Sequence, residues 1–112
     1  MINCKSVRNL ALALPEAVEQ DHWGRPSFRV RKKIFATLWE VERRAVLKLS
    51  QADQMAVVAA EPETYSMAQW SHQGWTMVEL KNADRGEFEH LLTQAWRQVA
   101  PKRVVKAFDE QS

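Results

Sequence analysis

A change in hydrophobic period at residue 27 constrains the fold of this chain more than any other feature. From there to residue 49, apolar side chains recur at every second position, in three runs that short charged segments separate. Such alternation is typical of half-buried strands, and short connections make neighbouring strands antiparallel. The runs predict an antiparallel meander whose apolar sets are Phe28 and Val30, then Ile34, Ala36 and Leu38, then Ala45, Leu47 and Leu49.

Helical patterns precede and follow this meander. Asn3 is a good N-cap for a first helix that Pro15 ends, and Ser50 and Asp84 begin two more. Pro101 suits the first turn of a fourth helix. The spacing of apolar residues predicts the buried faces of the first three helices: Val7, Leu10, Ala11 and Leu14; Met55, Val58 and Ala59; Phe88, Leu91, Leu92, Ala95, Trp96 and Val99.

The remaining segments complete an α+β pattern. Residues 75–81 form a fourth predicted strand, with Thr76, Val78 and Leu80 on one face. Residues 16–24 fit either a loop or a short edge strand, and a short strand is expected near Tyr65. The prediction is an α+β domain with an antiparallel sheet, helices on one face and the order α-β-β-β-α-β-α-α.

Length and composition fit a single domain over residues 1–112. Of the 112 residues, 46% are hydrophobic and 27% charged, and two separate cores would each be too small to be stable. No apolar stretch approaches the length of a membrane span, and the first residues lack the apolar core of a signal peptide. We therefore expect a cytoplasmic protein, in which the single cysteine, Cys4, forms no internal disulfide.

Charge is distributed unevenly along the chain, although the net charge is only +2. Residues 25–48 have a local net charge of +6, residues 49–96 one of −5, and the last sixteen residues one of +2. A basic segment on a balanced protein is compatible with a polyanionic partner, and it is also common on ordinary proteins.

The first predicted hairpin holds most of this positive charge. Alternation places its arginines on the face opposite Phe28 and Val30, and its two lysines at the tip. A positive tip can enter a groove of nucleic acid or follow its phosphates. The competing interpretation is a solvated sheet face whose charges protect an edge. The candidate nucleic-acid-binding residues are Arg25, Arg29, Arg31, Lys32 and Lys33.

Two aromatic loops form a second candidate site. The chain has five tryptophans, and three of them flank loops that also contain histidine and glycine. Exposed rings beside arginine can stack on planar ligands, whereas buried rings would form a second hydrophobic cluster under the loops. A concave pocket between the loops would favour ligand binding, and a continuous positive ridge would favour nucleic acid. The candidate pocket residues are His22, Trp23, Trp70, His72 and Trp75.

Catalysis is not indicated by the sequence. The three histidines lie far apart and belong to no Ser/His/Asp or Cys/His signature. Their spacing matches no metal-binding motif, and the three isolated glycines form no phosphate-binding loop. We predict a protein that is not an enzyme, with no catalytic residues, no metal and no cofactor.

Four segments resemble the MmcQ/YjbR-like family. The central motif of that family is similar to HWGRPSFRVRKKIFATL at residues 22–38, and shorter likenesses follow in AVLKL at 45–49, QGWT at 73–76 and WRQVAPK at 96–102. The resemblance implies a twisted antiparallel sheet with helices on one side, of broadly frataxin-like shape. It also carries the family's description as DNA-binding, with β-hairpins as wings. The first helix lacks the acidic ridge of an iron-binding frataxin, so iron binding is not carried over.

Two hypotheses follow. The leading one is a small DNA-binding or other nucleic-acid-binding domain that uses its basic hairpin and contacts mainly phosphates. The alternative is a non-enzymatic module that binds a protein or a small ligand through the loops around Trp23, Trp70 and Trp75.

Overall fold

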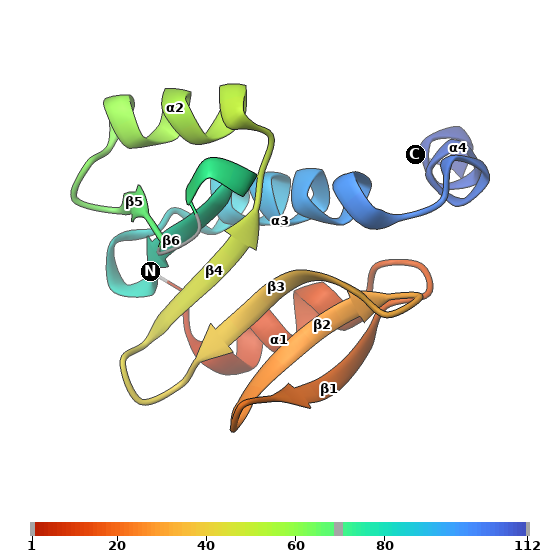
Figure 1. The fold of residues 1–112 in the computed structure, drawn as a ribbon, viewed down its shortest axis with the longest axis horizontal. Helices are drawn as coiled ribbons and strands as arrows, with labels where there is room; N and C mark the ends of the chain where they lie inside the picture. Colours follow the sequence, from red (N-terminus) through yellow and green to blue (C-terminus); the bar gives the residue numbers. More distant parts are fainter. Residues whose placement is uncertain (1, 69–70, 112) are drawn as a thin grey trace.

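The computed structural model describes residues 2–68 and 71–111, which form four α-helices and a six-stranded sheet (Figure 1). This confirms the predicted α+β class. The helices are α1 (Cys4–Leu12), α2 (Gln51–Ala60), α3 (Arg85–Val99) and α4 (Lys102–Gln111). The strands are β1 (Val18–His22), β2 (Arg25–Val30), β3 (Lys33–Trp39), β4 (Arg44–Lys48), β5 (Tyr65–Met67) and β6 (Trp75–Glu79).

The sheet is antiparallel and has the strand order β1-β2-β3-β4-β6-β5. The predicted meander supplies β2, β3 and β4 at its centre. Two edge strands are added to the predicted order of elements. Strand β1 forms in the segment predicted as either a loop or a strand, and β5 begins at Tyr65, where a short strand was expected. All residues of β1 but the last are exposed, so this strand has no alternation for the sequence to show.

Helices α1 and α3 cover one face of the sheet and lie behind the strands in Figure 1. The predicted N-caps Asn3, Ser50 and Asp84 each accept a backbone N–H bond from three residues on. Trp96 of α3 is fully buried, and its indole N–H donates to the Pro15 carbonyl oxygen at 2.9 Å. None of the described helices is long and apolar enough to cross a membrane.

Of the predicted buried face of helix α2, only Val58 packs against the core. Met55 is 66% exposed and Ala59 is also exposed, whereas Gln54 is buried. The Gln54 amide donates to the Trp75 carbonyl oxygen at 3.0 Å, which fixes the helix against the start of β6. A buried amide must be hydrogen-bonded, so this bond decides which face of α2 is buried. The spacing of apolar residues in the sequence cannot predict such a bond.

A β-bulge reverses the predicted faces at the start of β3. Phe28 pairs with Ala36 but Arg29 pairs with Ile34, so Phe35 is one residue extra. One extra residue shifts the alternation by one position. Phe35 is therefore buried in the core, while Ile34 lies on the opposite face together with Thr37.

Candidate binding surfaces

The sheet face that α1 and α3 leave open has a hollow of about 620 Å³, which we call the sheet hollow. Its floor follows one register row, in which Thr37 of β3 pairs with Val46 of β4, and Val46 pairs with Met77 of β6. The bulge adds Ile34 to this floor. The volume lies within the usual range for small-molecule sites, and the floor is mainly apolar, as in such sites.

Among the described residues, three tryptophans border the sheet hollow: Trp23, Trp39 and Trp75. Trp39 ends β3 and Trp75 begins β6. Because β3 and β6 are both antiparallel to β4, they run in the same direction, and the two rings lie at opposite ends of the floor. The result is a concave surface with an indole at each end.

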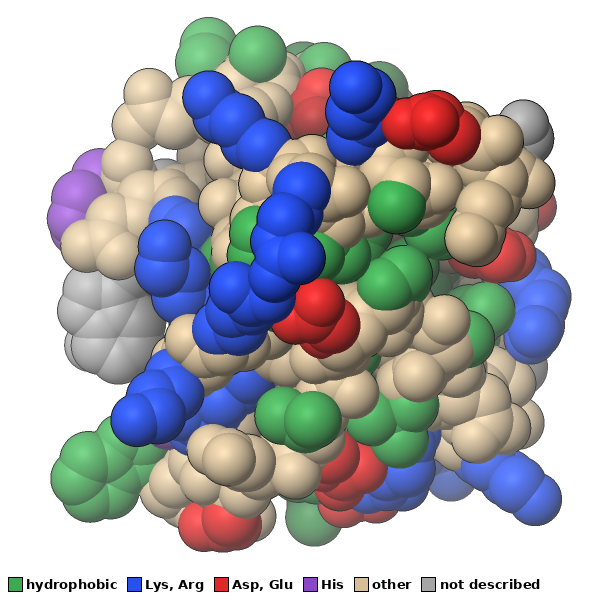
Figure 2. All heavy atoms as spheres, turned by 90° about the vertical axis from the view of Figure 1, so that its right-hand side faces the viewer, with side chains coloured by type: hydrophobic (Ala, Val, Ile, Leu, Met, Phe, Trp, Pro, Cys, Tyr) green, Lys and Arg blue, Asp and Glu red, His purple; other side chains and the backbone are tan. Residues whose placement is uncertain are grey.

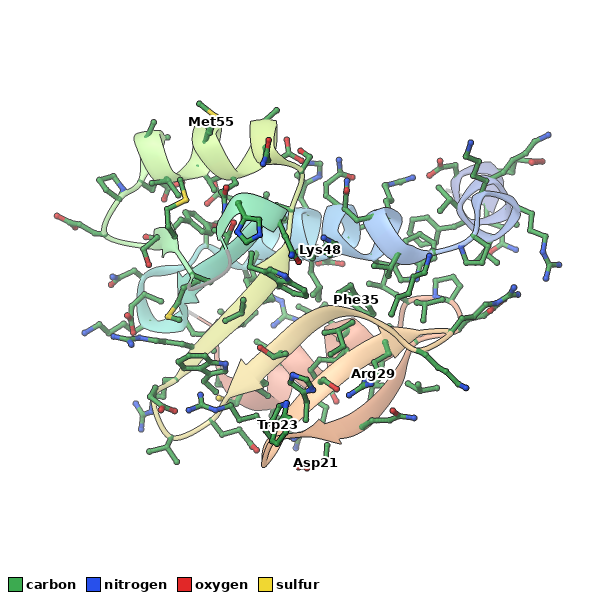
Figure 3. The ribbon with its side chains drawn as sticks, in the orientation of Figure 1. Asp21, Trp23, Arg29, Phe35, Lys48 and Met55 are labelled. Atoms are coloured by element: carbon green, nitrogen blue, oxygen red, sulfur yellow. The ribbon has the colours of Figure 1, made fainter. Side chains whose placement is uncertain are left out.

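Trp23 occupies the β1–β2 turn in an unusual conformation. Its φ is 56°, in the left-handed region that favours glycine, and its side chain is 91% exposed. This conformation costs roughly 1–2 kcal/mol for a residue with a Cβ. The ring makes an edge contact with His22, with centroids 6.3 Å apart, and Figure 3 shows it at the end of the sheet. Because the indole is so exposed, its burial offsets little of this conformational cost.

Arg25 forms part of one wall of the sheet hollow. Its guanidinium carbon lies 3.7 Å from the centroid of the Trp39 ring, a cation–π contact. Its Nη2 lies 3.4 Å from a carboxylate oxygen of Glu42, in a pair that is more than one-third exposed. The other terminal nitrogen, Nη1, is buried and has no hydrogen-bond acceptor among the described residues. A buried donor without an acceptor is uncommon in folded proteins.

Further cations lie on the same face of the sheet. Lys48 Nζ lies 5.4 Å from the Trp75 ring centroid and donates to the Gln73 carbonyl oxygen at 3.0 Å. Arg29 Nε donates to Ser27 Oγ at 2.9 Å, as predicted for a side chain opposite Phe28 and Val30. Figure 3 labels Arg29 and Lys48 on β2 and β4.

The two predicted aromatic loops meet in part. His22, Trp23 and Trp75 border the sheet hollow, whereas His72 is exposed in the 3₁₀ turn Ser71–Gln73 and is not among the bordering residues. Trp70 lies outside the described residues. Sequence reasoning missed Trp39 and Thr37 as members of this site. Their alternation opposite Ala36 and Leu38 placed them on one face of the strand, and that signal could have found them.

A second surface lies where the β2–β3 turn and α4 stand on the same side of the molecule (Figure 1). Figure 2 looks onto this side and shows Lys and Arg side chains gathered in a band over it. We define the basic ridge as the exposed cations of this turn, of the first residue of β3 and of α4: Arg31, Lys32, Lys33, Lys102, Arg103 and Lys106.

The β2–β3 turn differs slightly from its prediction. Its two residues are Arg31 and Lys32, with φ of 50° and 73°, and Lys33 already belongs to β3. Two consecutive positive φ angles indicate a type I′ turn, which normally prefers Asn-Gly. Arg31 Nε pairs with a Glu16 carboxylate oxygen at 3.0 Å on the surface. The predicted basic set is thus divided, with Arg25 and Arg29 on the sheet face and the other three on the basic ridge.

Helix α4 is fixed to α3 by its inner side. The Phe108 and Trp96 ring centroids are 5.0 Å apart, and Arg97 makes two bonds to the Asp109 carboxylate, at 2.9 and 2.6 Å. The Arg97 guanidinium holds the pKa of Asp109 below its ordinary value. Within residues 2–68 and 71–111, five members of the basic ridge have no ion-pair partner: Lys32, Lys33, Lys102, Arg103 and Lys106.

In the described part of the chain, the histidines near the sheet hollow lack carboxylate partners, and no acidic cluster is suited to a metal ion. Neither His22 nor His72 hydrogen-bonds to a carboxylate in the described part of the chain. Among these same residues, no group of three or more His, Cys, Asp and Glu side chains could hold a metal ion.

Comparison with known proteins places these surfaces in a family context. The YjbR family model matches residues 12–98, which include the sheet hollow and the β2–β3 turn but not α4. The fold is similar to the crystal structure of the Deinococcus radiodurans protein DR2400, a DUF419 domain, with a TM-score of 0.82 and 18% identity over 91% of this chain and 81% of that one. Identity this low supports the fold alone. No curated protein matches the chain.

Proposed function

The chain belongs to the YjbR family, and from that premise we propose that it is a nucleic-acid-binding domain, with DNA as its expected partner, whose basic ridge follows phosphates. One observation carries the proposal: cations of a hairpin turn and a terminal helix gather on one side of the molecule (Figure 2). Five of these six side chains lack an ion-pair partner in the described chain, so they are available to phosphate oxygens.

The remaining cation of the ridge can also exchange its partner. Arg31 pairs with Glu16 where the two side chains are 50% and 41% exposed. Exposed pairs contribute little to stability, so a phosphate can replace the carboxylate at small cost. Contacts to phosphates position a protein on nucleic acid without reading its bases. The expected binding is therefore dependent on salt and weakly dependent on sequence.

The proposal is for binding without catalysis. The cations of the ridge are lysines and arginines on the surface, and the histidines of the described chain lie elsewhere, at the sheet hollow, the 3₁₀ turn and α3. In this proposal, charge complementarity with the phosphates holds the polyanion in place.

Fluorescence anisotropy with labelled duplex and single-stranded DNA tests this proposal, from about 50 mM to about 200 mM salt. We expect the triple variant Arg31→Gln, Lys32→Gln and Lys33→Gln to weaken binding. The slope of log affinity against log salt should fall by about 0.9 for each duplex phosphate that the variant no longer binds.

A matched control removes the same charge elsewhere: Lys5→Gln, Lys81→Gln and Arg85→Gln. A third variant, Lys102→Gln with Arg103→Gln and Lys106→Gln, measures the share of α4. If the hairpin and control variants bind alike, or if the unmodified protein binds neither form of DNA, the proposal fails.

A second candidate function is favoured by the sheet hollow. A concave, largely apolar site of about 620 Å³ bordered by three indoles is suited to a small ligand rather than to a phosphate backbone.

A further inference from the structure

We propose that the sheet hollow is a separate site for a small, planar aromatic molecule that carries an acidic group. This inference goes beyond nucleic-acid binding, because the residues that form the hollow are not those of the basic ridge. It rests on four features of the open sheet face: its floor, its cations, an unpaired donor and the position of Trp23.

The floor and ends of the hollow suit a flat aromatic ring. Thr37 and Val46 are short side chains in the middle of one register row, so the surface is lowest there. Trp39 and Trp75 rise at opposite ends of the floor. A ring lying in this space contacts aliphatic groups below and indoles at its edges, an arrangement that aromatic pairs prefer over direct face-to-face stacking.

The buried Nη1 of Arg25 indicates an acidic group on the ligand. This donor has no acceptor, although its neighbour Nη2 contacts Glu42. The Glu42 contact is long, at 3.4 Å, and exposed, so a ligand oxyanion can displace it. A guanidinium turned toward a carboxylate or phosphate donates two parallel hydrogen bonds, which satisfies both terminal nitrogens. Stacking on Trp39 keeps the guanidinium plane in place during this exchange.

The charge of the whole sheet face is complementary to an anion. Arg44 is neutralised by Glu79, since Nε and Oε2 are 2.9 Å apart. Arg29 and Lys48 make their hydrogen bonds to the neutral Ser27 hydroxyl and the Gln73 carbonyl. Their charges therefore remain uncompensated by those partners, and the face attracts an anionic ligand more than a neutral one.

Trp23 is placed to cover such a ligand. Its left-handed backbone directs a 91% exposed indole to the border of the hollow. Positive φ angles at both Trp23 and Gly24 indicate a type I′ turn, and residues held in left-handed backbone cluster at functional sites. A ligand below this ring would bury part of it, which supplies the apolar contact that the unliganded protein lacks.

The test uses the full chain and three probes: 2-naphthoate, the neutral 2-naphthamide and the non-planar cyclohexanecarboxylate. Binding is followed by the indole N–H signals in ¹H–¹⁵N NMR spectra. We expect saturable shifts of the Trp39 and Trp75 signals with 2-naphthoate, and binding at least about tenfold weaker with either of the other probes. The Trp96 signal is an internal control, because that indole is buried and bonded to Pro15.

Variants separate the acid from the ring. Arg25→Met should reduce affinity for 2-naphthoate to that of 2-naphthamide, because only the acid uses the guanidinium. Val46→Phe fills the floor and should abolish binding of both probes. Arg31→Met, on the basic ridge, removes the same charge and should leave both affinities unchanged. An unchanged Trp96 signal shows that each variant is folded.

Three results would overturn the inference. The first is no shift of the Trp39 and Trp75 signals at saturating 2-naphthoate. The second is equal affinity for the acid and the amide, which would remove the acidic group from the ligand class. The third is competition between 2-naphthoate and single-stranded DNA, which would make the hollow part of one nucleic-acid site. DNA binding that is unchanged by Arg25→Met but weakened by the triple variant at residues 31–33 would support two separate sites.

Discussion

The basic ridge and the sheet hollow lie on different sides of the molecule and are built in opposite ways. The ridge consists of a two-residue turn and a terminal helix whose charged side chains extend into solvent. The hollow consists of a register row across β3, β4 and β6, with rings at the ends of strands. The charge of the basic ridge depends on which residues are present, whereas the shape of the sheet hollow depends on how the strands align.

This difference determines how each surface responds to substitution. Exposed cations can be replaced with little effect on folding, since surface changes usually alter stability by about 0.5 kcal/mol or less. A change that moves the alignment of β6 alters the hollow and the core together, because Thr76 and Val78 of that strand are buried while Trp75 and Met77, which alternate with them, border the hollow. Substitutions in the ridge should therefore change binding without changing stability, whereas substitutions that move the hollow should change both.

The largest expected effect is at Gly74, which precedes β6. Gly74 has a φ of +87°, and an added Cβ would overlap the Leu49 carbonyl oxygen. We expect Gly74→Ala to lower the free energy of unfolding by about 3 kcal/mol and to displace Trp75 from the hollow. Urea denaturation measures the first effect, and the indole NMR signal of Trp75 measures the second.

The control for this change is Gly24→Ala in the β1–β2 turn. Gly24 also has a positive φ, +84°, but an added Cβ there meets no atom within 4 Å. Its cost should be that of the backbone conformation alone, about 1 kcal/mol. Equal losses of stability at Gly74 and Gly24 would show that the backbone at Leu49 can move aside, and the coupled behaviour of the hollow would be contradicted.

A change of intermediate size is expected at the β2–β3 turn of the ridge. Replacing Arg31 and Lys32 by Asn and Gly provides the residues that a type I′ turn favours. Asn and Gly adopt positive φ angles at a lower energetic cost than Arg and Lys, and this gain outweighs the loss of the exposed ion pair between Arg31 and Glu16. The free energy of unfolding should therefore rise by about 1 kcal/mol. DNA affinity measured on the same sample should fall. A variant that loses both stability and affinity would show that this turn supports the fold rather than a partner.

The smallest expected effect lies away from both surfaces, where the end of α2 meets the start of α3. The pKa of Glu61 is raised, first by a hydrogen bond to the Glu87 carboxyl, then by burial and by repulsion from Glu87 and Asp84. An acid with a raised pKa in the folded state holds its proton more tightly there than in the unfolded chain. Stability from this group is therefore present below its ordinary pKa and is lost as pH rises through the raised value.

The variant Glu61→Gln tests this direction of the pH dependence of stability. The amide can donate to Glu87 at every pH, so the variant should melt up to about 2 °C higher than the unmodified protein at pH 7. The difference should disappear near pH 4, where Glu61 itself is protonated. Glu63→Gln, an exposed neighbour, is the control. A variant that melts lower at pH 7, or a difference that grows in acid, would contradict the assignment. DNA affinity and 2-naphthoate affinity should be the same in all three proteins.

Local features of the sequence determined the α+β class, the central meander and the helix starts. Asn3, Ser50 and Asp84 act within one turn of chain, and alternation over residues 27–49 reflects burial of one face of each strand. The positive charge of the hairpin is likewise a property of composition. These features need no information about distant residues, because capping and alternation are local consequences of backbone geometry.

Tertiary structure alone decided the rest. The bulge that moves Ile34 to the open face arises from pairing between two strands, and the inner face of α2 depends on a bond from Gln54 to a strand twenty-one residues away. The same holds for Arg25, whose place beside Trp39 and Glu42 separates it from the ridge to which its sequence neighbours belong. The contacts of Gln54 and Arg25 join residues far apart in the chain, and the bulge depends on how two strands pair. The energy that selects all three exists only once the strands are aligned.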